Sequence, residues 1–269
     1  MTAASPLRVP VLMYHEIAGI AATQSPLAVA PDVFADQLSY LRNAGFNTLT
    51  AGELAAILAD GVGTLPERPV VLTFDDGYAD FYSDALPLLK QNGFTGTIFM
   101  TTSGIGKEGE EKLMLNWREL AEVQQAGIEI GAHTVRHPQL DQLPEKLVRQ
   151  ELYDSKSLLE DRLQMKVPGL AYPFGYSNAM VRQVARELGY DYGYAVGNAI
   201  TTSSKDKFTF PRLTVRRSTS MDEFRKMVNG QDTLTVRRDR MLTKGFSVVR
   251  RTQIRLGLAR QPEWYLQAE

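Results

Sequence analysis

The sequence predicts an α/β fold with a mainly parallel sheet, and three observations support this. Strand-like and helix-like runs alternate almost from one end of the 269-residue chain to the other. Hydrophobic residues make up 43% of the chain, which is normal for a globular protein with a sizeable core. The polar motifs follow directly after apolar runs. Both closed barrels and open doubly wound sheets place their sites at the carboxyl ends of strands, so both topologies remain open.

Eight segments are predicted as strands because they are short, apolar and rich in β-branched or aromatic residues. The run from Val70 to Phe74 is continuous, which is typical of a strand buried on both faces. The predicted strands span residues 9–14, 46–49, 70–74, 97–100, 128–132, 169–173, 192–196 and 209–215. Two polar stretches, 104–111 and 201–207, are expected to be surface loops.

Seven segments are predicted as helices from apolar residues at helical spacing and from end signals. The first begins at Asp32, places Phe34, Leu38 and Leu41 on one side, and ends before Gly45. The others span residues 51–58, 82–91, 117–125, 144–163, 178–188 and 221–228.

The composition excludes several kinds of site. The chain has no cysteine, which rules out disulfides and thiolate catalysis and leaves histidines and carboxylates as ligands for zinc. The net charge of −1 argues against a protein built as a whole for nucleic acid. No apolar stretch approaches the length of a membrane span, and the first residues lack the features of a secretory signal. We therefore expect a cytoplasmic or membrane-peripheral protein, unless a leader has been removed.

The last part of the chain is basic. From Arg237 to Arg260 there are seven Arg and one Lys against the single acidic residue Asp239. Such a run is either a solvated face or a surface that docks on anionic lipid or an acidic partner. The apolar residues among these charges keep the second interpretation open.

Two adjacent carboxylates, Asp75 and Asp76, follow the predicted strand 70–74 and precede Gly77. Such a pair also occurs simply as the cap of a turn. Successive side chains leave a strand in opposite directions, so the two carboxylates share a site only if the chain bends at Gly77. One of them is then able to bind a metal while the other stays free as a base.

Two of the three histidines, His133 and His137, follow the predicted strand 128–132. Pro138 disfavours helix at His137, so we expect a loop there. A histidine pair is often purely structural, but one Asp with two His also makes a metal site with open positions for water and substrate. The third histidine, His15, ends the first strand on the same rim. It is either bonded to backbone or a candidate general acid.

A fourth segment, Tyr172-Pro173-Phe174-Gly175, also ends a strand. Pro and Gly fix a sharp turn, so one interpretation is a structural loop. The functional interpretation is that the backbone N–H of Phe174 points at a developing oxyanion.

These segments resemble motifs of a known family. The matching residues are Thr73-Phe74-Asp75-Asp76-Gly77, His133-Thr134-Val135-Arg136-His137-Pro138 and Tyr172-Pro173-Phe174-Gly175. Together they resemble the polysaccharide deacetylases of carbohydrate esterase family 4, over roughly residues 8 to 228. The resemblance implies a distorted (β/α)7 barrel of the TIM-like kind. The opening Val11-Leu12-Met13-Tyr14-His15 resembles the exopolysaccharide branch, which includes deacetylases of poly-N-acetylglucosamine.

The resemblance also implies a metal-dependent hydrolysis of the N-acetyl group of an N-acetylhexosamine. Asp75 would be the general base. The ligands of a divalent metal, usually Zn²⁺ with Co²⁺ or Ni²⁺ as alternatives, would be Asp76, His133 and His137. The motif of Tyr172 and Phe174 would face the oxyanion and the substrate.

The chain departs from the common family pattern at two places. The late motif that often supplies the acid has no histidine here, where the comparable region is 211–217. We therefore assign the acid to His15, as in the exopolysaccharide branch. The usual Arg of the third motif is missing, with Ala171 near its place, and we expect Arg212 to orient Asp75 instead.

We divide the chain into a deacetylase domain, residues 1–230, and a basic extension, residues 231–269. The expected substrate is a glycan rich in N-acetylglucosamine, with no role for nucleic acid. One alternative is a lipid-linked sugar or another amide, with peripheral membrane contact through the basic tail. Another is an inactive glycan-binding relative, against which the complete Asp-Asp-His-His set argues.

Overall fold

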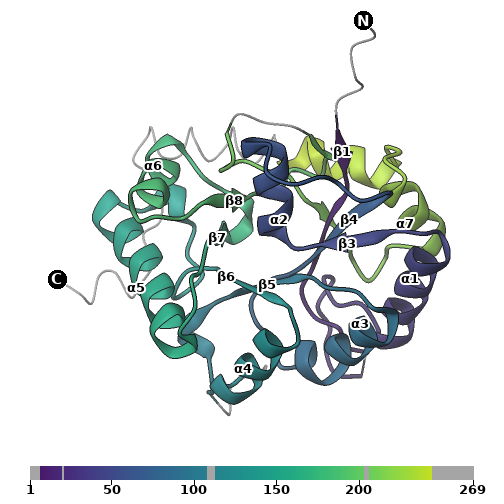
Figure 1. The fold of residues 1–269 in the computed structure, drawn as a ribbon, viewed down its shortest axis with the longest axis horizontal. Helices are drawn as coiled ribbons and strands as arrows, with labels where there is room; N and C mark the ends of the chain where they lie inside the picture. Colours follow the sequence, from purple (N-terminus) through teal and green to yellow (C-terminus); the bar gives the residue numbers. More distant parts are fainter. Residues whose placement is uncertain (1–6, 20, 108–112, 203–205, 244–269) are drawn as a thin grey trace, which may run out of the picture.

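The computed structural model describes residues 7–19, 21–107, 113–202 and 206–243. Its centre is a strongly curved sheet in which every strand pairing is parallel, in the order β10-β2-β4-β5-β6-β7-β8, with β3 beside the start of β4 (Figure 1). These strands are β2 (Val11–Tyr14), β3 (Asn47–Leu49), β4 (Pro69–Phe74), β5 (Thr97–Met100), β6 (Glu129–Ala132), β7 (Gly169–Ala171), β8 (Tyr192–Tyr194) and β10 (Leu213–Thr214).

The curved sheet nearly closes on itself between β8 and β10. The chain before β10 lies along the end of β8, where the backbone N–H of Ala195 donates to the carbonyl of Phe210 at 2.8 Å. Further along, the N–H of Asn198 donates to the carbonyl of Arg212 at 2.9 Å. Segment 210–215 therefore links the last strand of the sheet to the first, and we call this junction the seam. The architecture is the distorted (β/α)7 barrel that the motifs imply.

Helices surround the strands (Figure 1). They are α1 (Pro31–Asn43), α2 (Ala51–Ala55), α3 (Leu86–Asn92), α4 (Trp117–Gln125), α5 (Glu145–Leu163), α6 (Ala179–Glu187) and α7 (Met221–Val228), and a further helical segment spans 234–243. Several of them begin after a capping residue, since the side chains of Asn116, Asn178 and Ser220 each accept a hydrogen bond from a backbone N–H of the first turn. Within the described residues, no helix has the length and apolar content needed to cross a membrane.

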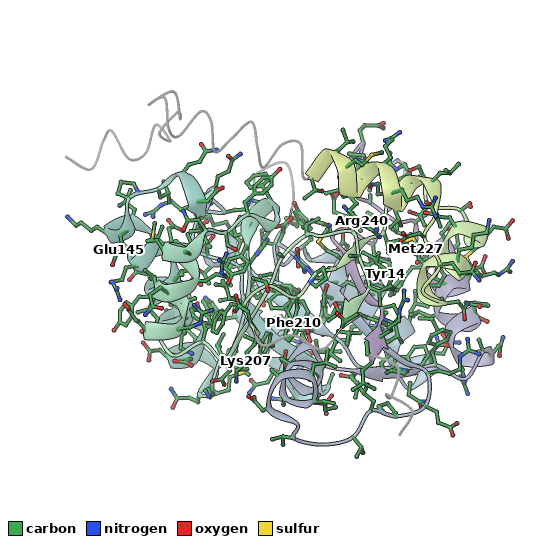
Figure 2. All side chains as sticks on the ribbon, turned by 90° about the horizontal axis from the view of Figure 1, so that it is seen from above. Tyr14, Glu145, Lys207, Phe210, Met227 and Arg240 are labelled. Atoms are coloured by element: carbon green, nitrogen blue, oxygen red, sulfur yellow. The ribbon has the colours of Figure 1, made fainter. Side chains whose placement is uncertain are left out.

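Buried side chains form two layers because strand residues alternate between the two faces of the sheet. Leu72 and Phe74 of β4 pack outward against the helices, while Val71 belongs to a smaller inner cluster with Phe99 and Phe210. Helix α2 contributes to the same inner cluster. Figure 2 shows the buried Phe210 near the centre and the exposed Glu145 at the periphery. The inner cluster lies directly below the polar motifs.

Three predictions of the elements were wrong in part. The strand predicted over 9–14 is interrupted at Pro10, which cannot donate to a ladder. Its first part, β1 (Arg8–Val9), pairs antiparallel with β9 (Thr201–Thr202), which lies in a stretch expected to be a loop. The strand predicted over 209–215 keeps only two residues of regular ladder, because Pro211 also lacks an N–H. The predicted loop 104–111 lies partly outside the described residues.

Candidate active site

The polar motifs meet in one cavity of about 380 Å³ at the carboxyl ends of the strands. This volume lies in the usual range of small-ligand sites. The cavity brings together His15, both aspartates, both histidines of the second motif, and Tyr172 and Phe174. Further lining comes from Met13 of the opening motif and from residues that the motifs do not include, namely Leu27, Tyr176, Val196, Asn198, Thr214, Arg216, Asp239, Leu242 and Thr243.

The two aspartates reach the same cavity because the chain turns sharply after β4. The backbone N–H of Asp75 still donates to the carbonyl of Tyr14, as in the strand, at 3.0 Å. Asp76 then adopts a left-handed conformation with φ of 75°, and Gly77 follows with φ of 91°. A side chain at Gly77 would place its Cβ 2.3 Å from the Cε atom of Met100. The predicted bend is therefore present, and it begins one residue earlier than expected.

The histidine pair lies on a loop, as Pro138 predicts. Thr134 and His137 both have positive φ, of 70° and 59°, which folds the loop back over the end of β6. The hydroxyl of Thr134 accepts from the backbone N–H of His137 at 3.0 Å and stabilises the turn. Both imidazoles consequently face Asp76.

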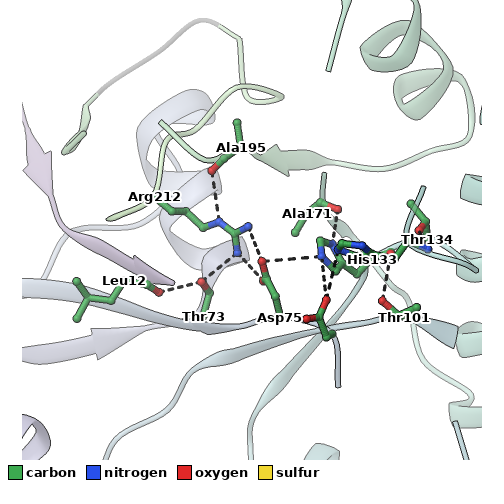
Figure 3. A network of polar contacts seen from close by, with 11 residues as sticks. Leu12, Thr73, Asp75, Thr101, His133, Thr134, Ala171, Ala195 and Arg212 are labelled. Carbon is green, nitrogen blue, oxygen red and sulfur yellow. Dashed lines mark hydrogen bonds and ion pairs between the residues drawn. The ribbon is translucent and has the colours of Figure 1, made fainter. Parts of the chain in front are cut away.

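The side chains of Asp76, His133 and His137 form a cluster whose ligand atoms all lie within 4.8 Å of one another. The Nε2 atoms of His133 and His137 lie 3.5 and 3.4 Å from the Oδ1 atom of Asp76. The Nδ1 atom of His133 donates to the carbonyl of Ala171 at 2.8 Å, so Nε2 keeps its lone pair (Figure 3). Burial lowers the pKa of His133 to about 4, which keeps the ring neutral at neutral pH. This donor set fits a divalent metal ion.

Asp75 lies beside this cluster, with its Oδ2 atom 3.9 Å from Nε2 of His133, and it is bonded to a buried arginine. The two Nη atoms of Arg212 donate to the two carboxylate oxygens at 2.6 and 2.7 Å (Figure 3). The guanidinium also donates to the hydroxyl of Thr73 and lies over the ring of Phe99. Burial acts to raise the pKa of Asp75, but Arg212 and His133 outweigh it and hold this pKa at about 2. The carboxylate is therefore charged and fixed in orientation at neutral pH.

The other predicted site residues line the same cavity. Burial lowers the pKa of His15, which works against a role as an acid, while the nearby Asp75 and Asp76 act in the opposite direction. Phe174 has a positive φ of 58°, a costly conformation for an aromatic residue, and its ring contacts that of His137. Tyr172 is fully buried.

Sequence reasoning missed a carboxylate that supports the histidine loop. Glu151 of α5 is 1% exposed, and its Oε2 atom accepts from the backbone N–H groups of Val135 and Arg136, both at 2.9 Å. Its Oε1 atom accepts from the Arg136 guanidinium at 3.0 Å. The available signal was its position on the apolar side of the predicted helix, where a charged residue is unusual.

Comparisons with known proteins point to one family. The model of the polysaccharide deacetylase family matches residues 62–193. YxkH of Bacillus subtilis (strain 168), whose name assigns it to the polysaccharide deacetylases, is 32% identical over 219 residues, which cover 81% of this chain and 75% of YxkH. The poly-β-1,6-N-acetyl-D-glucosamine N-deacetylase of Staphylococcus aureus (strain N315) is 25% identical over 215 residues, which cover 76% of this chain and 72% of that protein.

Solved structures share the fold. The Streptococcus pyogenes deacetylase PplD, in complex with acetate, superposes with a TM-score of 0.76 and 27% identity, covering 85% of this chain and all of that one. IcaB from Ammonifex degensii superposes with a TM-score of 0.71 and 26% identity, covering 82% of this chain and 96% of that one.

Proposed function

Because this chain belongs to the polysaccharide deacetylase family, we propose that it is a metal-dependent hydrolase that removes N-acetyl groups from N-acetylglucosamine units of a glycan. The observation that carries the proposal is the arrangement at the carboxyl ends of β4 and β6. Three potential ligands share one cavity with a separate carboxylate, Asp75, which is bonded to Arg212 instead of belonging to the cluster. Metal-assisted hydrolysis needs both parts.

The residues that would hold the metal are Asp76, His133 and His137. The ligand set suits Zn²⁺, with Co²⁺ and Ni²⁺ as alternatives. When bound, such an ion would polarise the acetyl carbonyl and make water more acidic.

The remaining residues would handle protons and charge. Asp75 would accept the proton of the attacking water, and Arg212 would keep that carboxylate ionised and pointed into the cavity. His15 would give a proton to the leaving amine. The backbone N–H of Phe174 would stabilise the oxyanion, and Tyr172 would support the turn that presents it.

We assign these steps to a domain of residues 1–230. The extension 231–269 begins with the helix 234–243, which packs on that domain, and Val236 is buried in its core. The basic run from residue 244 onward lies outside the described residues, so the proposed peripheral membrane contact of this tail stays a prediction.

The proposal is tested by measuring acetate release from three substrates: a β-1,6-linked N-acetylglucosamine polymer, its short oligomers and a lipid-linked N-acetylated sugar. We expect release from the polymer or its oligomers, loss of this activity with a chelator, and recovery with zinc. Asp76→Asn should abolish it, whereas Asp36→Asn, on the exposed side of α1, should not. Acetate from the lipid-linked sugar alone would favour the alternative substrate. Release that persists without metal would reject the mechanism.

A further inference from the structure

The seam of the barrel lies across the cavity from the metal-ligand cluster. In the strand order, β5 is the middle strand, and the ligands follow its two neighbours, β4 and β6. The seam joins the two ends of that order, β8 and β10. In a closed ring of strands, the ends of the order meet opposite the middle. A TIM barrel surrounds its site with loops after eight strands, whereas the strand order here has seven, and within the described residues no eighth strand lies between β8 and β10.

The helix 234–243 occupies this position. Thr233 precedes it and accepts from the backbone N–H of Val236 at 3.1 Å, as an N-cap does. Arg240 then donates from Nε to the carbonyl of Asn198, just after β8, at 3.0 Å. Figure 2 shows Arg240 on this helix. The helix is therefore fastened to the β8 side of the seam.

An ion pair fastens the same helix to the β10 side. Nε of Arg216, two residues after β10, donates to the carboxylate of Asp239 at 3.1 Å. Asp239 is 7% exposed, and both residues line the cavity. Leu242 and Thr243, one helical turn further on, line it as well. The start of the extension is thus a wall of the site.

We propose that Arg216, Asp239, Leu242 and Thr243 form a subsite for the sugar unit next to the one that is deacetylated. The inference rests on the proposed function, and it makes the substrate a glycan chain instead of a single sugar. With the acetyl group held at the ligand cluster, a chain that crosses the cavity reaches the opposite wall. That wall offers what a pyranose recognises: charged groups for its hydroxyls, and the exposed Leu242 side chain for its C–H face.

The test uses the zinc-loaded protein, the β-1,6-linked tetramer of N-acetylglucosamine and two variants of adjacent residues. Leu242→Ala removes a cavity residue, and Met241→Ala removes an even more exposed apolar side chain that does not line the cavity. We expect Leu242→Ala to raise KM for the tetramer about tenfold with kcat changed less than about threefold, which is the loss of a contact made equally in the ground state and the transition state. Met241→Ala should match the wild type.

Calorimetric titration measures binding of the tetramer independently of catalysis. It therefore tests the subsite even if the proposed function is wrong. If the wild type releases acetate but the two variants behave alike, or kcat falls in Leu242→Ala while KM does not change, the subsite is wrong and the function stands. If the wild type releases no acetate, the function is wrong, and binding decides the subsite. Weaker tetramer binding by Leu242→Ala than by Met241→Ala would then support it, and equal or absent binding would overturn it.

Discussion

The pair formed by Asp75 and Arg212 gives the sharpest prediction on stability. The side chains are 3% and 0% exposed, and two hydrogen bonds of 2.6 and 2.7 Å join them. Removing one partner leaves the other charge buried without compensation, which costs about 3–5 kcal/mol. Replacing both with neutral groups of similar size removes that penalty. We therefore expect Asp75→Asn and Arg212→Met each to lower the free energy of unfolding by about 3–5 kcal/mol, and the double variant to lose far less than the sum.

Urea unfolding of the metal-free protein at neutral pH measures these energies. A matched control is the exposed pair of Lys166 and Asp191, 66% and 49% exposed with a separation of 2.6 Å. The same comparison of single and double variants of this control pair should give a coupling energy of less than about 1 kcal/mol. Additive losses at Asp75 and Arg212 would refute the reasoning. Acetate release provides a second measurement. The double variant should be more stable than either single variant, but it should stay inactive because it lacks the Asp75 carboxylate.

Three further predictions concern other buried groups. Glu151→Gln should leave the protein folded but weaken zinc binding about 10- to 100-fold in a calorimetric titration, because the loop of His137 loses its charged anchor; unchanged affinity would contradict this. His15→Ala should lower kcat about 10²- to 10⁴-fold while zinc still binds, and full activity would exclude its role as acid. Burial raises the pKa of Glu129, so the folded protein holds this proton more tightly than the unfolded chain. Stability in urea should then fall as the pH rises from about 4.5 through the raised pKa, and Glu129→Gln should lose this slope.

Local patterns predicted most of the fold. The strand 97–100 and the helices 117–125 and 221–228 match β5, α4 and α7 to the residue. These segments carry their own signals, such as β-branched runs, capping residues and terminal glycines, and tertiary contacts do not override them. The residues of the predicted motifs were equally visible, because each motif directly follows a buried strand. The strand order then brings them to one cavity.

What local patterns could not supply were contacts between distant segments. The contact of Arg212 with Asp75, 137 residues away, was expected only from the departure from the family pattern and not from any local pattern, and the closure of the barrel brings the two residues together. The strands β1 and β9 pair with each other, but each has only two residues, which is too short for a periodic pattern in the sequence. The charge run predicted the extension as basic, yet it gave no sign that Asp239 would turn inward to Arg216.

The position of Arg212 ties the closure of the barrel to the proposed base. The family pattern expects an arginine near Ala171, but here the carbonyl of Ala171 accepts a hydrogen bond from His133 and its side chain carries no charge. The guanidinium comes instead from segment 210–215, which also bonds to the end of β8 and to β2. The ligand cluster depends on β4 and β6, on the far side of the ring. The orientation of Asp75 therefore depends on a closed seam, whereas the three metal ligands lie on the loops after β4 and β6.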